Sequence, residues 1–340
     1  MTVAAIAATA VAAETEFIPY LNDVAIIMQR LMNISAEENP ALKGRAMECM
    51  GHMAVAVEKE AFRPYFAETV RVAGTCLTAD NTDLHEYAYA VFANLAKVME
   101  REFSPALPEL VPHLLDVITK SDGALEAFDG AAEGGGAFDD SDDEEEAGQQ
   151  FVVRTAALDI KKQALVAING MAAYCGQDYM PYLEKTCEAL KQQTDISEEV
   201  YWHPDVVCEA VRTLPALAIC SVAAHHPDGK VPWVKGDLTN NPMAPHTRQV
   251  VDAVMPSIVL CMKSEEKEVV AAACDGVQAV VDLCGPFSLA TVVNDVLQSL
   301  LLLLAGKAEC QGGDEDDEEE DDEEGEHDNF MNSVFDLLGR

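Results

Sequence analysis

Phe17-Ile18-Pro19-Tyr20 sets a pattern of an aromatic residue, any residue and then proline, which returns three times along the chain. The later copies are Phe62-Arg63-Pro64-Tyr65, Phe103-Ser104-Pro105-Ala106 and Tyr179-Met180-Pro181-Tyr182. The first three copies are 45 and 41 residues apart, and an acidic, glycine-rich stretch lies before the fourth. Because proline is tolerated in the first turn of a helix, each copy predicts a helix start. Two-helix repeats of roughly 40–47 residues are typical of HEAT-type solenoids.

Apolar residues recur at helical spacing through most of the chain. The pattern predicts paired A and B helices over 15–33, 41–58, 62–78, 83–100, 104–120, 155–175, 179–193, 204–224, 247–263, 266–284 and 288–306. Met1–Ala13 fits the B helix of a further repeat. We therefore expect an all-α HEAT-repeat α-solenoid, a right-handed superhelix of antiparallel helix pairs.

Composition divides the chain into two blocks of repeats with acidic inserts. HEAT repeats are expected over 1–121 and over 151–308, the second block with a long loop at 225–245. Residues 122–150 and 309–328 are expected to be disordered, because such segments bury too little apolar surface to offset the entropy of ordering. Residues 329–340 read as the start of a further HEAT helix. Neither end shows a polar capping repeat, so the sequence predicts an internal segment of a longer array.

The net charge of −38 at pH 7 restricts the possible partners. Of 60 acidic residues, 7 lie in Asp139–Glu146 and 13 in Asp314–Asp328, so the remainder is acidic as well, against only 22 basic residues. Such a field repels nucleic acid and anionic lipid and attracts basic proteins. We expect basic protein partners, no direct contact with nucleic acid and no membrane association. The alternative is that the acidity only keeps a large solenoid soluble.

The remaining sequence features argue against a secreted protein, a membrane protein or an enzyme. The ten cysteines are scattered without a Cys-x-x-Cys motif, which favours buried free thiols in a reducing compartment. The N-terminal stretch lacks the charged region of a signal peptide, and Leu300–Ala305 falls far short of a membrane span of roughly 20 residues. No phosphate-loop, nucleophile-elbow or zinc-helix motif occurs. We predict no catalytic residue, metal or cofactor, and His225-His226 is expected to be solvated.

Several phrases taken together resemble the importin-β (karyopherin-β) family, most closely the branch containing importin four and importin five. In that branch an acidic segment similarly precedes a B helix that opens on a Lys-Thr-Ala or Arg-Thr-Ala-like phrase. The matching stretches are Phe138–Asp143, Val153–Asp159, Tyr174–Gly176, Tyr179–Tyr182, the proline-kinked phrase Arg212–Pro215, and Val334–Leu338 after the second acid run.

The resemblance implies a nuclear import receptor that shuttles between cytoplasm and nucleus through the nuclear pore. It would carry basic cargo such as histones or ribosomal proteins, bind FG-nucleoporins, and release cargo to Ran-GTP mainly through repeats outside this segment. In importin-like solenoids the B helices line the concave face. Helical spacing there nominates Glu48, Glu86, Asp159, Glu209 and Asp275, with Trp202 as a stacking platform for cations. The acid runs add Asp139, Asp140, Asp142, Asp143, Glu144, Glu145, Glu146, Asp316, Asp317, Glu318, Glu319 and Glu320.

Two other classes remain open from the sequence. One is an acidic HEAT-repeat scaffold resembling a phosphatase regulatory subunit, which would favour regular repeats without long acid inserts. The other is an acidic histone chaperone without transport activity, which the acid runs alone support. Each nominated acid could also be an ordinary solvated surface residue.

Overall fold

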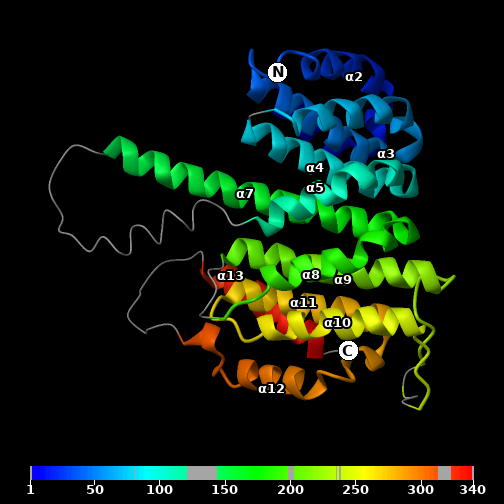
Figure 1. Ribbon diagram of the computed structural model, residues 1–340, viewed down its shortest axis with the longest axis vertical. Coiled ribbons are helices and arrows are strands. Elements are labelled where there is room, and N and C mark those ends of the chain that lie inside the picture. Colours follow the sequence, from blue (N-terminus) through cyan, green and yellow to red (C-terminus); the bar gives the residue numbers. More distant parts are fainter. Residues whose placement is uncertain are drawn as a thin grey trace. The chain divides into compact units, whose positions relative to one another are not determined.

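The computed structural model describes residues 2–79, 81–120, 144–197, 203–234, 236, 239–312 and 323–338 (Figure 1). For 144–156, 323–329 and 338 it describes the backbone alone. The chain forms two compact units, Met1–Met171 and Ala172–Arg340. Throughout the described ranges the regular structure consists of α-helices and short 3-10 helices, as expected for a HEAT-repeat α-solenoid.

The first unit stacks successive helix pairs. Its elements are α1 (Val3–Ala13), η1 (Glu14–Phe17), α2 (Ile18–Met32), α3 (Pro40–Cys76), α4 (Thr82–Met99), η2 (Glu100–Ala106), α5 (Leu107–Thr119) and most of α7 (Glu144–Tyr174). Helix α3 contacts α1, α2 and α4. It is a kinked double helix, because Glu58 has the non-helical angles φ 62° and ψ 176°. The two halves match the separate helices predicted over 41–58 and 62–78.

The second unit repeats this arrangement. Its elements are η3 (Gly176–Tyr182), α8 (Leu183–Gln193), α9 (Pro204–His225), α10 (Pro245–Cys261), α11 (Lys267–Cys284), η4 (Pro286–Leu289), α12 (Val293–Leu304), η5 (Glu309–Gln311) and α13 (Glu323–Leu338). The B helix α11 contacts the B helices α9 and α13, and the A helix α8 contacts α10 (Figure 1). Helix α9 is long and apolar enough to span a membrane, but 78% of its apolar window is buried, which is typical of a core helix.

The recurring aromatic–proline phrases mark helix starts, as predicted. Their aromatic residues Phe17, Phe62, Phe103 and Tyr179 are all buried in the core. Each phrase follows a residue with positive φ that redirects the chain from a B helix into an A helix: Glu14, Glu58, Glu100 and Gly176. In the third and fourth copies the proline lies in a 3-10 helix directly before α5 and α8.

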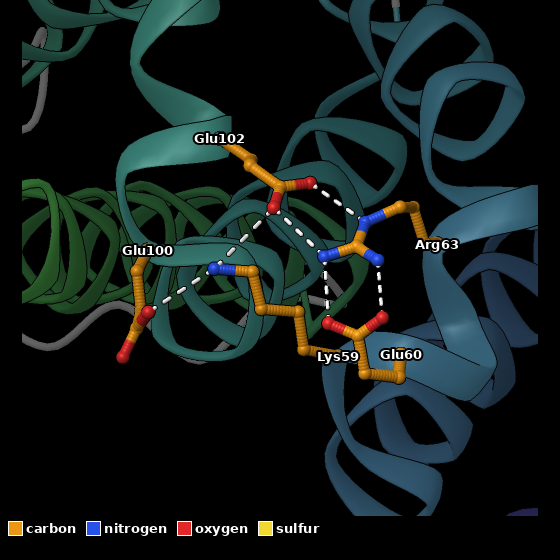
Figure 2. A network of polar contacts seen from close by, with 5 residues as sticks. All are labelled: Lys59, Glu60, Arg63, Glu100 and Glu102. Carbon is orange, nitrogen blue, oxygen red and sulfur yellow. Dashed lines mark hydrogen bonds and ion pairs between the residues drawn. The ribbon is translucent and has the colours of Figure 1, made fainter.

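Charged side chains join two successive turns of the first unit (Figure 2). Arg63 donates to both carboxylate oxygens of Glu102, from Nε at 3.0 Å and from Nη2 at 2.9 Å. It also pairs with Glu60 one turn earlier in α3. Lys59 Nζ lies 3.2 Å from Glu100 and 3.5 Å from Glu102. The network ties the α3 kink to η2, so that neighbouring repeats are held at their turns.

The ten cysteines are free and buried, as the sequence predicts. Burial raises the pKa of the Cys220, Cys261, Cys274 and Cys284 thiols to about 12. Since the thiolate is the reactive form, these side chains serve as small apolar core residues rather than as nucleophiles.

The long loop expected at 225–245 is present between α9 and α10, but part of it is packed rather than solvated. Val231 is buried, and its N–H donates to the Leu283 carbonyl at 3.2 Å. The Trp233 ring lies against Gly285, where an added Cβ would come within 2.3 Å of it. The loop therefore crosses the end of α11 and fastens one repeat to the next.

Two expected boundaries differ from the structure. Helix α7 begins at Glu144 rather than near 155, and α13 begins at Glu323 rather than near 330. Glutamate is a good helix former and its charge is favourable at a helix N-terminus, so acidic residues extend both helices towards their acid runs. Residues 309–311 form η5, in which Cys310 is buried. Of the segments predicted to be disordered, 122–143 and 313–322 lie outside the described ranges.

Candidate functional site

Three of the predicted acids meet on the B helices of the first unit. Glu48 of α3, Glu86 of α4 and Asp159 of α7 are all half-buried. Burial raises the pKa of the Glu86 carboxyl, and the charges of Asp159, Asp83 and Glu48 raise it further. Asp83, which sequence reasoning missed, thus belongs to the same group. We call Glu48, Asp83, Glu86 and Asp159 the N-terminal acid cluster.

An arginine and an aromatic ring complete this cluster. Arg45 Nη1 lies 3.3 Å from Glu48 Oε2, and the Arg45 guanidinium carbon lies 5.7 Å from the centre of the Tyr87 ring. The ring lies directly on Gly44, where an added Cβ would be only 2.1 Å from Tyr87 Cδ2. Helix α3 therefore offers a bare backbone at this point, and α4 places a flat aromatic surface over it. Sequence reasoning nominated neither Arg45 nor Tyr87.

The second unit brings together the other two predicted acids. Glu209 Oε1 of α9 accepts from Arg212 Nη1 at 2.7 Å. Burial lowers the pKa of Arg212, but the hydrogen bond from Arg212 to Glu209 and the charge of nearby Asp275 on α11 outweigh burial and raise it. Glu209 and Asp275 therefore share one cation, on two neighbouring B helices.

An open cavity of about 350 Å³ lies along these helices. We call it the α9–α11–α13 groove, and it is lined by Arg212, Lys267, Glu268, Ala271, Asp275, Phe330 and Ser333. The lining contains positive side chains (Arg212 and Lys267), negative side chains (Glu268 and Asp275) and a buried aromatic ring, Phe330. Such a lining suits an amphipathic chain whose cationic end reaches a carboxylate while its stem packs on apolar surface.

The other predicted site residues are not brought into these groups. Trp202, Asp139, Asp140, Asp142, Asp143 and the five acids from Asp316 to Glu320 lie outside the described residues. Glu144, Glu145 and Glu146 form the first turn of α7. Among the residues that the structure describes, no group of three or more His, Cys, Asp or Glu could hold a metal ion.

The histidine pair has a structural use rather than full solvation. The His225 ring stacks on His246 with centroids 5.0 Å apart, and His226 is buried, with Nε2 accepting from the Ala244 N–H at 3.3 Å. The expectation that this pair is solvated is therefore wrong for His226, which is buried, whereas His225 is exposed. The two rings hold the ends of the long loop together, because they join the end of α9 to the start of α10.

Comparison with curated proteins gives importins, although no protein-family model matches the chain. It is 29% identical to probable importin subunit beta-4 of Schizosaccharomyces pombe over 197 residues, 55% of this chain and 18% of that protein. It is 26% identical to human importin-4 over 97% of this chain and 31% of that protein. The chain thus spans less than a third of the length of these relatives.

Solved structures show the same fold. The chain matches Kap121p with a TM-score of 0.63 and 18% identity, covering 99% of this chain and 30% of that one. It matches a complex of this karyopherin with the SUMO protease Ulp1p equally well, with a TM-score of 0.63. The relatives and the structural neighbours are importins and karyopherins, which confirms the resemblance: the chain is related to the importin-β family. Members of this family are transport receptors and not enzymes.

Proposed function

We propose that this chain is a cargo-binding part of a nuclear import receptor and that it recognises basic segments of its cargo. The observation that carries the proposal is the N-terminal acid cluster, in which carboxylates from three successive B helices lie near enough for their charges to act on Glu86. Burial raises the pKa of Glu86, and the charges of Asp159, Asp83 and Glu48 raise it further, so a cation that enters would relieve the repulsion among these carboxylates. A lysine or arginine side chain from cargo supplies that cation.

The binding chemistry of the two units differs in a useful way. The N-terminal acid cluster offers carboxylates beside an aromatic ring, and the α9–α11–α13 groove offers a carboxylate beside apolar surface. Each by itself suits a basic segment, and the groove of the second unit also suits apolar residues within such a segment. Histones and ribosomal proteins are cargo of this class. Among the structural neighbours, Kap121p is bound to Ste12p, to Pho4p and to Nup53p.

The remaining parts of the transport cycle follow from the same proposal. Nup53p bound to Kap121p supports nucleoporin contact, which we place between neighbouring A helices. Release by Ran-GTP would depend mainly on repeats other than these. The receptor would shuttle between the cytoplasm and the nucleus.

The acid runs Asp139–Glu146 and Asp314–Asp328 have a separate role in this proposal. Dispersed charge accelerates encounter with a basic partner more than it holds the complex. Its effect also weakens with salt, because the Debye length is about 8 Å at physiological ionic strength. The runs therefore attract cargo, and the helical acids retain it.

Binding kinetics with a basic histone-tail peptide test the proposal. Glu48→Gln/Glu86→Gln/Asp159→Asn should speed dissociation, whereas neutralising Asp139–Glu146 should slow association and leave dissociation nearly unchanged. A matched control is Glu16→Gln/Glu37→Gln/Glu38→Gln, which removes the same charge from exposed positions of the same unit. The proposal fails if binding is indifferent to both changes and to salt.

A histone chaperone without transport activity is the second candidate, because 20 acidic residues lie in the two runs. The two functions differ in their nucleoporin contacts. A receptor segment should bind an immobilised FG-repeat peptide, and a chaperone should not. The chaperone would instead prevent the precipitation of histones with DNA at low salt.

A further inference from the structure

The N-terminal acid cluster already contains a cation supplied by the chain itself. The Arg45 guanidinium lies beside Glu48 at 3.3 Å and over the Tyr87 ring at 5.7 Å. A carboxylate and an aromatic face are the two kinds of group that hold cationic side chains at protein surfaces. Arg45 therefore occupies the kind of position in which a cargo lysine or arginine would be held.

Charge in the cluster is unbalanced even with Arg45 in place. Burial and the charges of Asp159, Asp83 and Glu48 raise the pKa of Glu86. Arg45 lowers this pKa, but the net result is still a raised value. Arg45 is thus paired with Glu48, while the charges of Asp83 and Asp159 also act on Glu86. The cluster retains attraction for further cations, so a ligand that brings several gains more than one that merely replaces Arg45.

Arg45 is the member of the site that can move. Its side chain is 53% exposed, and an exposed ion pair contributes little to stability. Tyr87, in contrast, is packed against the backbone of Gly44. Rotation of the Arg45 side chain into solvent would leave Glu48 and the ring face available without disturbing the packing of α3 on α4.

We propose that Arg45 is an internal competitor, a resident counter-ion that fills the cluster in the free chain and that basic cargo displaces. This inference rests on the proposed function. Exchange of one cation for another yields little net affinity, so a single surface lysine does not displace Arg45. A segment with several basic residues does, because it also reaches Glu86, Asp83 and Asp159. Arg45 thereby sets the number of positive charges that cargo must carry.

Arg71 provides a matched control in the same unit. Arg71 Nη2 pairs with Glu68 Oε1 at 2.7 Å, also three residues apart on α3, with exposures of 57% and 38% against 53% and 31% for Arg45 and Glu48. Arg71→Gln removes the same charge from the same kind of pair, but away from the acid cluster. Any increase in affinity for a basic peptide that is due only to the more negative net charge will appear in both variants.

The experiment compares the chain with its Arg45→Gln and Arg71→Gln variants by fluorescence anisotropy. The probes are two labelled peptides of equal length, one with a single lysine and one with five. Arg45→Gln should tighten binding of the five-lysine peptide by roughly three- to tenfold, as expected from losing an exposed ion pair and a cation–π contact as competitors. It should tighten the single-lysine peptide at least as strongly, while Arg71→Gln changes both by less than about twofold.

The outcomes separate this inference from the function on which it rests. If the wild-type chain binds the five-lysine peptide and Arg45→Gln weakens binding, or tightens it no more than Arg71→Gln, Arg45 is not a competitor although the proposed function stands. If neither the wild type nor Arg45→Gln binds, both proposals fall. Binding by Arg45→Gln alone would support the competitor role most directly. Equal melting temperatures confirm that the variants are folded.

Discussion

The hydroxyl of Tyr89 on α4 lies 2.8 Å from Nε2 of His113 on α5, which joins a B helix to the following A helix inside the first unit. Burial lowers the pKa of His113, and the neighbouring His85 lowers it further. The folded state thus favours the neutral imidazole, whereas the unfolded chain takes up a proton near pH 6.5. A depressed folded pKa contributes stability above the unfolded value, and that contribution is lost as pH falls.

We therefore expect the first unit to lose stability between pH 7.5 and pH 5.5. His113→Gln, whose side chain does not titrate, should make the urea midpoint less dependent on pH over this range. Tyr89→Phe should keep the pH dependence, since burial is the main cause of the shift. An unchanged pH dependence in His113→Gln would show that another group is responsible.

Glu58 is the second position at which the structure predicts a change of stability. Its angles of φ 62° and ψ 176° lie in a region that glycine alone adopts readily. Glu58→Gly should raise the free energy of unfolding by about 1 kcal/mol, because it removes Cβ strain at the kink of α3. Glu58→Ala removes the same carboxylate but keeps Cβ, so it should give no such gain in denaturant unfolding. Equal free energies of unfolding for Glu58→Gly and Glu58→Ala would show that the backbone at Glu58 is not strained.

The network in Figure 2 makes a third prediction, about salt. Glu102→Gln removes the negative charge shared by Arg63 and Lys59 and one of its two acceptor oxygens, so the melting temperature of the first unit should fall. The fall should shrink as salt is added, because all of these side chains are accessible to solvent. Glu37→Gln, at an exposed position in the same unit, is the control for net charge. Calorimetry at 20 mM and 500 mM salt measures the difference, and a loss independent of salt would indicate packing rather than charge.

Two glycines of the second unit allow a matched test of the packed loop. Gly285, with φ 78°, carries the Trp233 ring, while Gly229, with φ 68°, has no neighbour within 4 Å. Gly229→Ala should cost about 1 kcal/mol for its backbone alone. Gly285→Ala should cost more, by a further 1–3 kcal/mol or so, because the ring must leave. Limited proteolysis should then cut the loop 226–244 faster in Gly285→Ala only. Equal rates of cutting in the two variants would show that the contact at Gly285 does not hold the loop in place.

The helices were predictable because their signals are local. The aromatic–proline phrases and the apolar stripes depend on residues within a few turns, so starts such as Ile18 and the division of α3 near Glu58 follow from the sequence. The starts of α7 and α13 could not be predicted in this way. Their glutamates lie in acidic stretches whose composition predicts disorder, but glutamate also extends helices. The Val231 and Trp233 contacts depend on a distant turn at Gly285, which no pattern in the loop specifies.

The candidate site was predictable to the same extent. Helical spacing placed Glu48, Glu86 and Asp159 on B helices, and the structure brings them together. Arg45, three residues before Glu48, left a sequence signal that could have been used. Tyr87 left none, because its contact with Gly44 depends on the register between two helices that are far apart in the sequence.

The buried thiols give the chain a built-in set of probes for local opening. Cysteines lie on α3, α8, α9, α10 and α11, and all are shielded in the folded state. Because a helical array interacts mainly between neighbours, one repeat can open while others stay closed. The rate at which a maleimide labels each cysteine, resolved by peptide mass, would therefore rank the repeats by the ease with which they open. If a basic ligand slows labelling at some cysteines and not at others, the protected cysteines identify the repeats that the ligand stabilises.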